Sequence, residues 1–204
     1  MKSIYSLVLS DEVVAKIDQE AYRMHTSRSN LINQILSEHF SCVTPEMRMQ
    51  AVFSSMESLI HQFRILEQTS ANMLALQSQL NYKYKPTVQY MVQLYKNPEK
   101  NYAGVLHIRL RTQNPLLLAS LEQFFRMWAH WEKEYLPSET EYRFSPGRME
   151  RLIPYLDVDE ETFGQRIGNY VGQFDKYLKD WFSDVSPEEM EMHFRQDAAE
   201  TDLI

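Results

Sequence analysis

Residues 2–41 read KSIYSLVLSDEVVAKIDQEAYRMHTSRSNLINQILSEHFS, and this stretch decides the fold that we expect for the N-terminal part of the chain. It opens with an alternating segment in which Tyr5, Leu7 and Leu9 fall on one side of a predicted strand. A single strand has an open edge that must pair with another strand. The sequence therefore predicts that a second copy of the chain supplies the missing strand.

Two short helices are predicted after this strand. Ser10 is an N-cap, and Asp11 and Glu12 place carboxylates in the positive first turn of the first helix. The stretch 24–29 provides a short turn with hydroxyl caps before the second helix. Both helices carry one apolar stripe, formed by Val13, Val14, Ile17, Ala21 and Met24 in the first and by Leu31, Ile32, Ile35, Leu36 and Phe40 in the second. A strand and two helices of this length cannot enclose a core, so the segment requires a partner chain.

This order of elements, with Thr26-Ser27-Arg28-Ser29 ahead of the second helix, resembles the ribbon-helix-helix superfamily of Arc-, MetJ- and CopG-type repressors. The resemblance covers residues 2–41, about a fifth of the chain. It implies a dimer in which two strands form an antiparallel ribbon that enters the major groove of double-stranded DNA. We expect the dimer interface of this module to contain Tyr5, Leu7, Leu9, Leu31, Ile32 and Ile35.

The resemblance also implies which residues contact DNA. The groove-facing positions of the strand are Ile4, Ser6 and Val8, with Lys2 just ahead of them. Ser27, Arg28 and Ser29 would present the N-terminus of the second helix to a phosphate, where free amide groups and the helix dipole favour an anion. His25 stands where a glycine is common in the turn of this family.

A long connecting helix is predicted over residues 44–83. Thr44 and Pro45 are a start signal, and neither glycine nor proline occurs between residues 46 and 83. Apolar residues recur in steps of three and four, and the predicted seam residues are Met56, Leu59, Phe63 and Leu66. This spacing favours an interchain coiled coil. The alternative is an amphipathic helix packed on its own domain.

Residues 84–204 are predicted to form a C-terminal α+β domain that oligomerises or senses a signal. Residues 87–95 and 104–112 alternate as two strands around a polar turn, which predicts one β-hairpin. Helices are expected from Asn114-Pro115 onward, from Ser145-Pro146 to Leu156, over 159–182, and after Ser186-Pro187. The predicted fold is thus mainly α with small β elements: a ribbon-helix-helix module over 1–43, a long helix, and a helical domain with one hairpin.

Composition bounds the class of protein. The 204 residues carry a net charge of −7, of which residues 139–204 account for most, with 7 basic and 16 acidic side chains. No apolar run approaches the roughly 20 residues that cross a bilayer, no secretory signal is apparent, and Cys42 is the single cysteine. We therefore expect a bacterial, cytoplasmic, nucleoid-associated protein without membrane contact. The histidines show no ligand spacing and no catalytic motif is found, so no metal, no cofactor and no enzymatic activity are predicted.

The sequence is best interpreted as a sequence-specific DNA-binding transcriptional regulator, in particular a repressor, that acts as a homodimer or higher oligomer. Two alternatives share the same DNA-binding module. One is a DNA-binding accessory protein of a mobile element, such as a relaxosome or partition protein, whose C-terminal domain would recruit a protein partner. The other is an antitoxin-type interaction protein, which the long aromatic-rich C-terminal part argues against.

Overall fold

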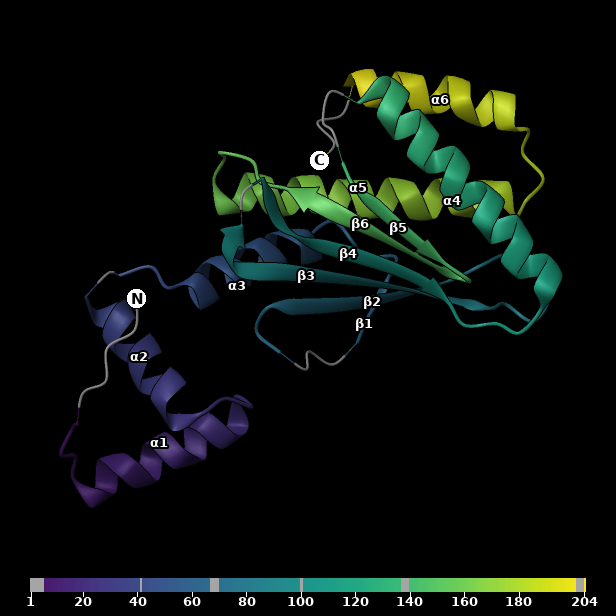
Figure 1. Cartoon of the computed structure of the whole chain (residues 1–204). Coiled ribbons are helices and arrows are strands. Elements are labelled where there is room, and N and C mark those ends of the chain that lie inside the picture. Colours follow the sequence, from purple (N-terminus) through teal and green to yellow (C-terminus); the bar gives the residue numbers. More distant parts are fainter. Residues whose placement is uncertain (1–5, 41, 67–69, 100, 137–139, 201–203) are drawn as a thin grey trace. The chain divides into compact units, whose positions relative to one another are not determined.

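The computed structural model describes residues 6–40, 42–66, 70–99, 101–136, 140–200 and 204. The chain divides into two compact units, residues 1–47 and 48–204, which are described separately below. The described residues carry six helices and six strands, whose labels appear in Figure 1.

The first unit contains the two predicted short helices, α1 (Asp11–Arg23) and α2 (Arg28–His39). The side chain of Ser10 accepts a hydrogen bond from the backbone N–H of Val13, so it caps α1 as predicted. Between the helices His25 has a φ of 50°, a left-handed conformation that is uncommon outside glycine but less so for asparagine, aspartate and histidine than for other residues. A glycine would adopt this conformation without steric cost, whereas His25 adopts it here with a side chain.

The part of the N-terminus that the structure describes does not form the predicted ribbon. Residues 6–10 lead into α1 without helix or strand structure, and the expected strand is wrong for this segment. Lys2, Ile4 and Tyr5 lie outside the described residues. The side chains of Leu7 and Leu9 are exposed in the single chain, so no apolar contact within the unit holds the segment as a strand.

The predicted long helix over 44–83 is also wrong. The helix that starts there, α3 (Pro45–Glu57), ends after 13 residues. It is followed by the short strand β1 (Arg64–Ile65) and by β2 (Met73–Gln79). In β2 burial alternates, with Leu74, Leu76 and Ser78 buried and the residues between them more exposed. Pairing with the next strand decides this conformation, because leucine, methionine, alanine and glutamine prefer helices on their own.

The second unit is built on an antiparallel sheet with the strand order β1-β2-β3-β4-β6-β5, rather than on a single hairpin. The predicted strands at 87–95 and 104–112 correspond to β3 (Thr87–Glu99) and β4 (Tyr102–Leu110) in its centre. The remaining strands are β5 (Tyr142–Ser145) and β6 (Arg148–Pro154), which replace the short helix predicted over 145–156. Pro146 and Gly147, with a φ of +70° at the glycine, form the tight turn between them.

Three further helices complete the second unit: α4 (Pro115–Tyr135), α5 (Glu160–Trp181) and α6 (Pro187–Glu200). Figure 1 shows α5 running along the sheet. Buried side chains on one face of the sheet pack with buried side chains of the four helices α3 to α6. Together they form one hydrophobic cluster, which is the core of the unit. On the other face a transverse row is formed by the paired residues Gln77, Gln89, Arg109 and Arg148, whose side chains are half-buried or exposed.

Candidate functional site

The N-terminus of α2 is the first candidate site. The side chain of Ser27 accepts a hydrogen bond from the backbone N–H of Asn30 at 3.2 Å, which makes Ser27 the N-cap. The first amides of a helix have no acceptor within the helix, so those of Arg28 and Ser29 remain available to an external anion. The guanidinium of Arg28 forms a bidentate ion pair with the carboxylate of Asp18 on α1. Sequence reasoning missed this pairing, since ten residues separate the two side chains.

The predicted DNA-contacting residues that the structure describes come from two segments of the chain. Ser6 and Val8 are exposed in the segment ahead of α1. Ser27, Arg28 and Ser29 lie together in the first turn of α2 or directly before it. The unit thus offers the capped start of α2 and an exposed segment ahead of α1 as candidate DNA contacts.

The first unit leaves most of its apolar side chains uncovered. Among the described residues of 6–47, Ala21 and Leu31 are the buried apolar side chains. Of the predicted interface residues, Leu31 is 4% exposed, Ile32 is half-buried and Ile35 is 48% exposed. The exposed apolar residues of this unit are Leu7, Val8, Leu9, Val13, Tyr22, Met24, Ile35, Leu36, Phe40 and Val43. A surface of this kind typically marks an interface with another molecule.

The four predicted seam residues do not line one helix. Met56 and Phe63 are buried in the core of the second unit, Leu66 is half-buried beside β1, and Leu59 is 41% exposed. The backbone N–H of Leu66 donates to the carbonyl of Ala75 on β2, which places Leu66 at the edge of the sheet. The coiled-coil interpretation of Met56, Leu59, Phe63 and Leu66 is therefore incorrect, because the helix ends at Glu57 and Met56 and Phe63 serve the intrachain core.

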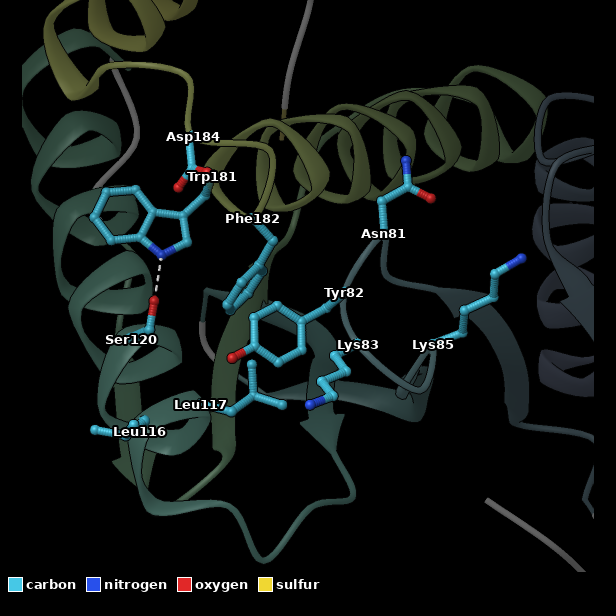
Figure 2. Close-up of a pocket in the computed structure, with 10 residues that line it drawn as sticks. All are labelled: Asn81, Tyr82, Lys83, Lys85, Leu116, Leu117, Ser120, Trp181, Phe182 and Asp184. Atoms are coloured by element: carbon cyan, nitrogen blue, oxygen red, sulfur yellow. Dashed lines mark hydrogen bonds between the residues drawn. The ribbon is translucent and has the colours of Figure 1, made fainter.

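A cavity of the second unit is the second candidate site, and Figure 2 shows its lining. It has a volume of about 610 Å³ and lies between the loop that joins β2 to β3, the start of α4 and the end of α5. The lining residues are Asn81, Tyr82, Lys83, Lys85, Leu116, Leu117, Ser120, Trp181, Phe182 and Asp184. Aromatic rings, two lysines and one aspartate thus line a space large enough for a small molecule. Figure 2 shows the ammonium group of Lys83 directed toward Leu117 and that of Lys85 directed away from the aromatic rings.

Two contacts hold the aromatic side of this cavity. The indole N–H of Trp181 donates to the hydroxyl of Ser120 on α4 at 2.9 Å. The rings of Tyr82 and Phe182 meet edge to face, with their centroids 5.7 Å apart. Sequence reasoning missed this site, because its residues come from three segments more than thirty residues apart. In the sequence, nothing distinguishes these positions from ordinary helix residues: Leu116, Ser120 and the aromatic pair Trp181-Phe182.

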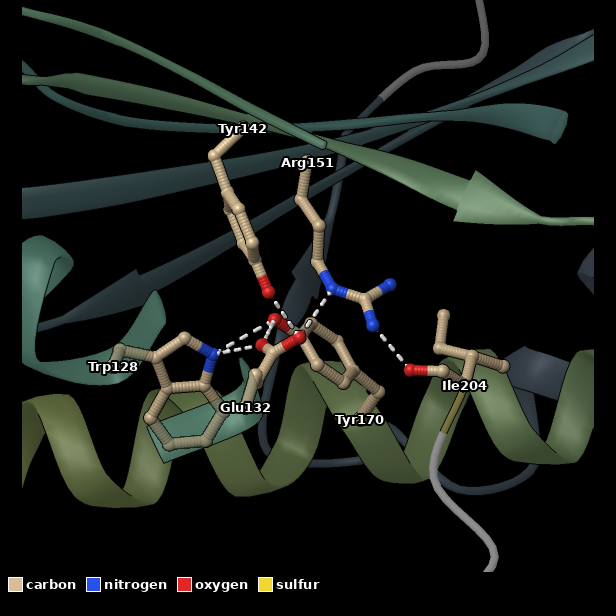
Figure 3. A network of polar contacts seen from close by, with 6 residues as sticks. All are labelled: Trp128, Glu132, Tyr142, Arg151, Tyr170 and Ile204. Atoms are coloured by element: carbon tan, nitrogen blue, oxygen red, sulfur yellow. Dashed lines mark hydrogen bonds and ion pairs between the residues drawn. The ribbon is translucent and has the colours of Figure 1, made fainter. Parts of the chain in front are cut away.

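A buried polar network connects α4 with the sheet, as Figure 3 shows. The carboxylate of Glu132 on α4 accepts hydrogen bonds from Trp128, from the hydroxyls of Tyr142 and Tyr170, and from Nε of Arg151 at 2.8 Å. Arg151 also donates to the backbone carbonyl of Ile204 and lies 4.2 Å from the ring centroid of Tyr170. Glu132 and Arg151 are both almost fully buried, and their opposite charges compensate each other.

The environment of this network favours neutral tyrosines and a charged arginine. Burial, and next the charge of Glu132, raise the pKa of Tyr142 and of Tyr170 far above the usual value of a phenol. Burial opposes the charge of Arg151 and is the largest single influence on it, but the interactions with Glu132, Tyr170 and Tyr142 together outweigh burial, so the pKa of Arg151 is raised. Each tyrosine thus acts as a hydrogen-bond donor to the carboxylate. We attribute a structural role to this network, because its polar groups bond to one another and join α4, α5 and the sheet.

Among the described residues, no group of three or more His, Cys, Asp or Glu side chains could hold a metal ion. None of the helices in the described ranges is long and apolar enough to cross a membrane. Comparison of the chain with protein-family models, with curated proteins and with solved structures finds no match.

Proposed function

We propose that this protein is a sequence-specific DNA-binding transcriptional regulator that acts as a homodimer or higher oligomer through residues 1–47. One observation carries the proposal: a capped two-helix unit with an uncovered apolar surface. The two apolar side chains that are buried in the described part of this unit are too few to hold it folded. We therefore propose that a second copy of the chain covers the apolar surface. We propose DNA as the ligand because the α1-turn-α2 sequence resembles that of DNA-binding repressors.

In the proposed complex the N-terminus of α2 contacts a DNA phosphate. Ser27 caps the helix and the amides of Arg28 and Ser29 face the anion. The ion pair between Arg28 and Asp18 is exposed on both sides, and exposed pairs contribute little to stability. A phosphate can therefore take the place of Asp18 beside Arg28. Ser6 would contact a base edge, and Val8 would contact a thymine methyl group.

The folded second unit favours a regulator with an attached sensing or oligomerising domain over an antitoxin. Residues 48–204 contain a sheet of six strands, and its core is shared with four helices. A toxin-binding tail, by contrast, would expose its apolar side chains. The second candidate function is that of a mobile-element accessory protein, in which this unit would bind a protein partner.

The test uses DNA duplexes selected from a random library by the full chain. We expect Arg28→Ala to weaken binding to selected and scrambled duplexes by the same factor, because a phosphate contact carries no sequence information. The slope of log affinity against log salt concentration should fall by about one. Fluorescence anisotropy titrations at several salt concentrations measure both quantities.

Asp18→Asn is the matched control for Arg28→Ala. It removes the carboxylate that competes for Arg28, so affinity should stay the same or rise, with an unchanged preference for the selected duplex. Ser6→Ala should alter the preferred sequence. The proposal fails if no duplex is enriched by the full chain, or if Arg28→Ala binds with parental affinity and salt dependence.

A further inference from the structure

The cavity of Figure 2 has no part in the proposed contact with DNA, although it combines the features of a ligand site. We propose that it binds a small molecule composed of a planar aromatic ring with an anionic group at one end and a hydrogen-bond donor at the other. This inference concerns the second unit alone and does not rest on DNA binding.

Three aromatic side chains in the walls of the cavity favour a ligand with a planar ring. Tyr82, Trp181 and Phe182 contribute three rings, and Leu117 contributes an apolar floor that is buried. The three aromatic side chains remain partly exposed, so each has ring surface to offer to a ligand. Aromatic rings attract one another in edge-to-face and offset geometries, as Tyr82 and Phe182 already do here. At about 610 Å³ the cavity falls within the range of small-molecule sites.

Two lysines in the lining of the cavity favour a ligand with an anionic group. Lys83 and Lys85 line the cavity, and Asp184 is the one carboxylate among its described lining residues. Figure 2 shows Asp184 beside Trp181, on the far side of Tyr82 from both lysines. The ammonium group of Lys83 also lies 5.4 Å from the ring centroid of Tyr84. An anion is therefore favoured at the lysine end and a hydrogen-bond donor at the Asp184 end.

The backbone around the cavity supports a functional role. Four residues other than glycine have a positive φ among the described ones, and three of them lie here: Tyr84 at 67°, Lys85 at 42° and Asp184 at 60°. Such conformations are unfavourable for these side chains, persist only where the surroundings impose them, and cluster at ligand sites. Hydrogen bonds from Lys85 N–H to the Tyr82 carbonyl and from Leu80 N–H to the Pro86 carbonyl fix the loop. The lysines are thus presented by a loop of defined shape.

Isothermal titration calorimetry on the full chain tests the proposal with two matched pairs of probes. AMP and indole-3-acetate each carry a planar ring, a ring-borne N–H donor and an anion, whereas adenosine and indole-3-acetamide lack the anion. We expect at least one anionic probe to bind saturably, at least tenfold more tightly than its neutral partner. The double variant Lys83→Gln/Lys85→Gln should lower the affinity for that anionic probe about tenfold and leave the neutral probe unaffected.

Lys133→Gln, an exposed lysine of α4 outside the cavity, is the control and should bind like the parent. An unchanged thermal melt of the double variant shows that its fold is intact. The proposal is overturned if neither anionic probe binds, if each binds no more tightly than its neutral partner, or if the double variant binds like the parent. Because no DNA is present, these outcomes leave the DNA-binding proposal unaffected.

Discussion

Glu132 illustrates how one residue organises the second unit. Its carboxylate is buried between α4, α5 and the sheet and accepts hydrogen bonds from an indole, two phenols and a guanidinium. Removing one partner of a buried ion pair leaves the other charge uncompensated, which is far more costly than losing an exposed pair. The two tyrosines matter because they satisfy the carboxylate only while they keep their protons.

Protein stability should accordingly fall above pH 10. The folded state raises the pKa of Tyr142 and Tyr170, through burial and the charge of Glu132, whereas an unfolded tyrosine titrates near pH 10. Above pH 10 the unfolded chain therefore binds fewer protons than the folded chain, so the free energy of unfolding decreases as pH rises. Each of these tyrosines contributes a slope of about 1.4 kcal/mol per pH unit.

Tyr142→Phe should remove one such contribution, so its free energy of unfolding declines less steeply between pH 10 and 11.5. Urea denaturation at a series of pH values measures the slope. Tyr155→Phe, at an exposed tyrosine, is the control and should retain the parental slope. Equal slopes for the parent and Tyr142→Phe would show that Tyr142 ionises in the folded state.

At this scale the sequence predicts what depends on near neighbours. Ser10 and Ser27 cap their helices through a residue three positions ahead, and such spacings are visible in the sequence. Glu132 read as an ordinary charge within a helix. Its partners Tyr142, Arg151 and Tyr170 lie 10 to 38 residues away, and only the completed fold brings them together.

Among the elements, the contact between α3 and α5 depends on the glycines of α5. Gly164, Gly168 and Gly172 recur every four residues and therefore share one face of the helix. A Cβ atom at position 164 would lie 2.3 Å from the backbone carbonyl oxygen of Val52. The backbones of the two helices are thus closer here than any other residue would permit, and the four-residue spacing is the signal that the sequence offered.

Gly164→Ala should therefore destabilise the second unit, by about 3 kcal/mol, because backbone atoms of α3 must move. Gly172→Ala is the matched control in the same helix, since its Cβ would meet no atom closer than 3.7 Å. There the better helix propensity of alanine should raise stability by about 0.8 kcal/mol. Chemical denaturation followed by tryptophan fluorescence measures both. Equal effects of the two substitutions would contradict the close approach.

The errors at the scale of elements have a common physical origin. Met49, Val52 and Met56 obey helical spacing within α3, and the pattern continues by coincidence through residues that form strands. Leu74 and Leu76 become buried because β3 pairs with β2, a contact that the local sequence does not encode. A strand such as β2, which contains mostly helix-favouring residues, is therefore missed by sequence reasoning.

For the whole molecule, the two units differ in how they are stabilised. Residues 48–204 bury one continuous core of helices and sheet, whereas the described part of residues 1–47 buries Ala21 and Leu31. Sequence reasoning anticipated the incomplete core of the first unit, because the lengths of its elements show it directly. It did not anticipate the sheet of the second, because four of its six strands were interpreted as helix or left unassigned.

The stability of the first unit should consequently depend on protein concentration, and that of the second should not. All three tryptophans, Trp128, Trp131 and Trp181, belong to the second unit, so their fluorescence reports its unfolding alone. Far-ultraviolet circular dichroism also detects α1 and α2. We expect a first thermal transition that is visible only by circular dichroism and moves to lower temperature on dilution, because the proposed dimer would dissociate as the unit unfolds.

Leu36→Glu places a charge on the uncovered apolar surface of α2, where the parental side chain is 45% exposed. It should convert the dimer to a monomer in sedimentation equilibrium and abolish the first transition, while the tryptophan transition stays in place. Met192→Glu, an exposed apolar position on α6, is the control and should leave the dimer intact. A parent chain that is monomeric at every concentration, or a tryptophan transition that shifts with Leu36→Glu, would contradict dimerisation through this surface. The second case would assign the surface to contacts of the second unit instead.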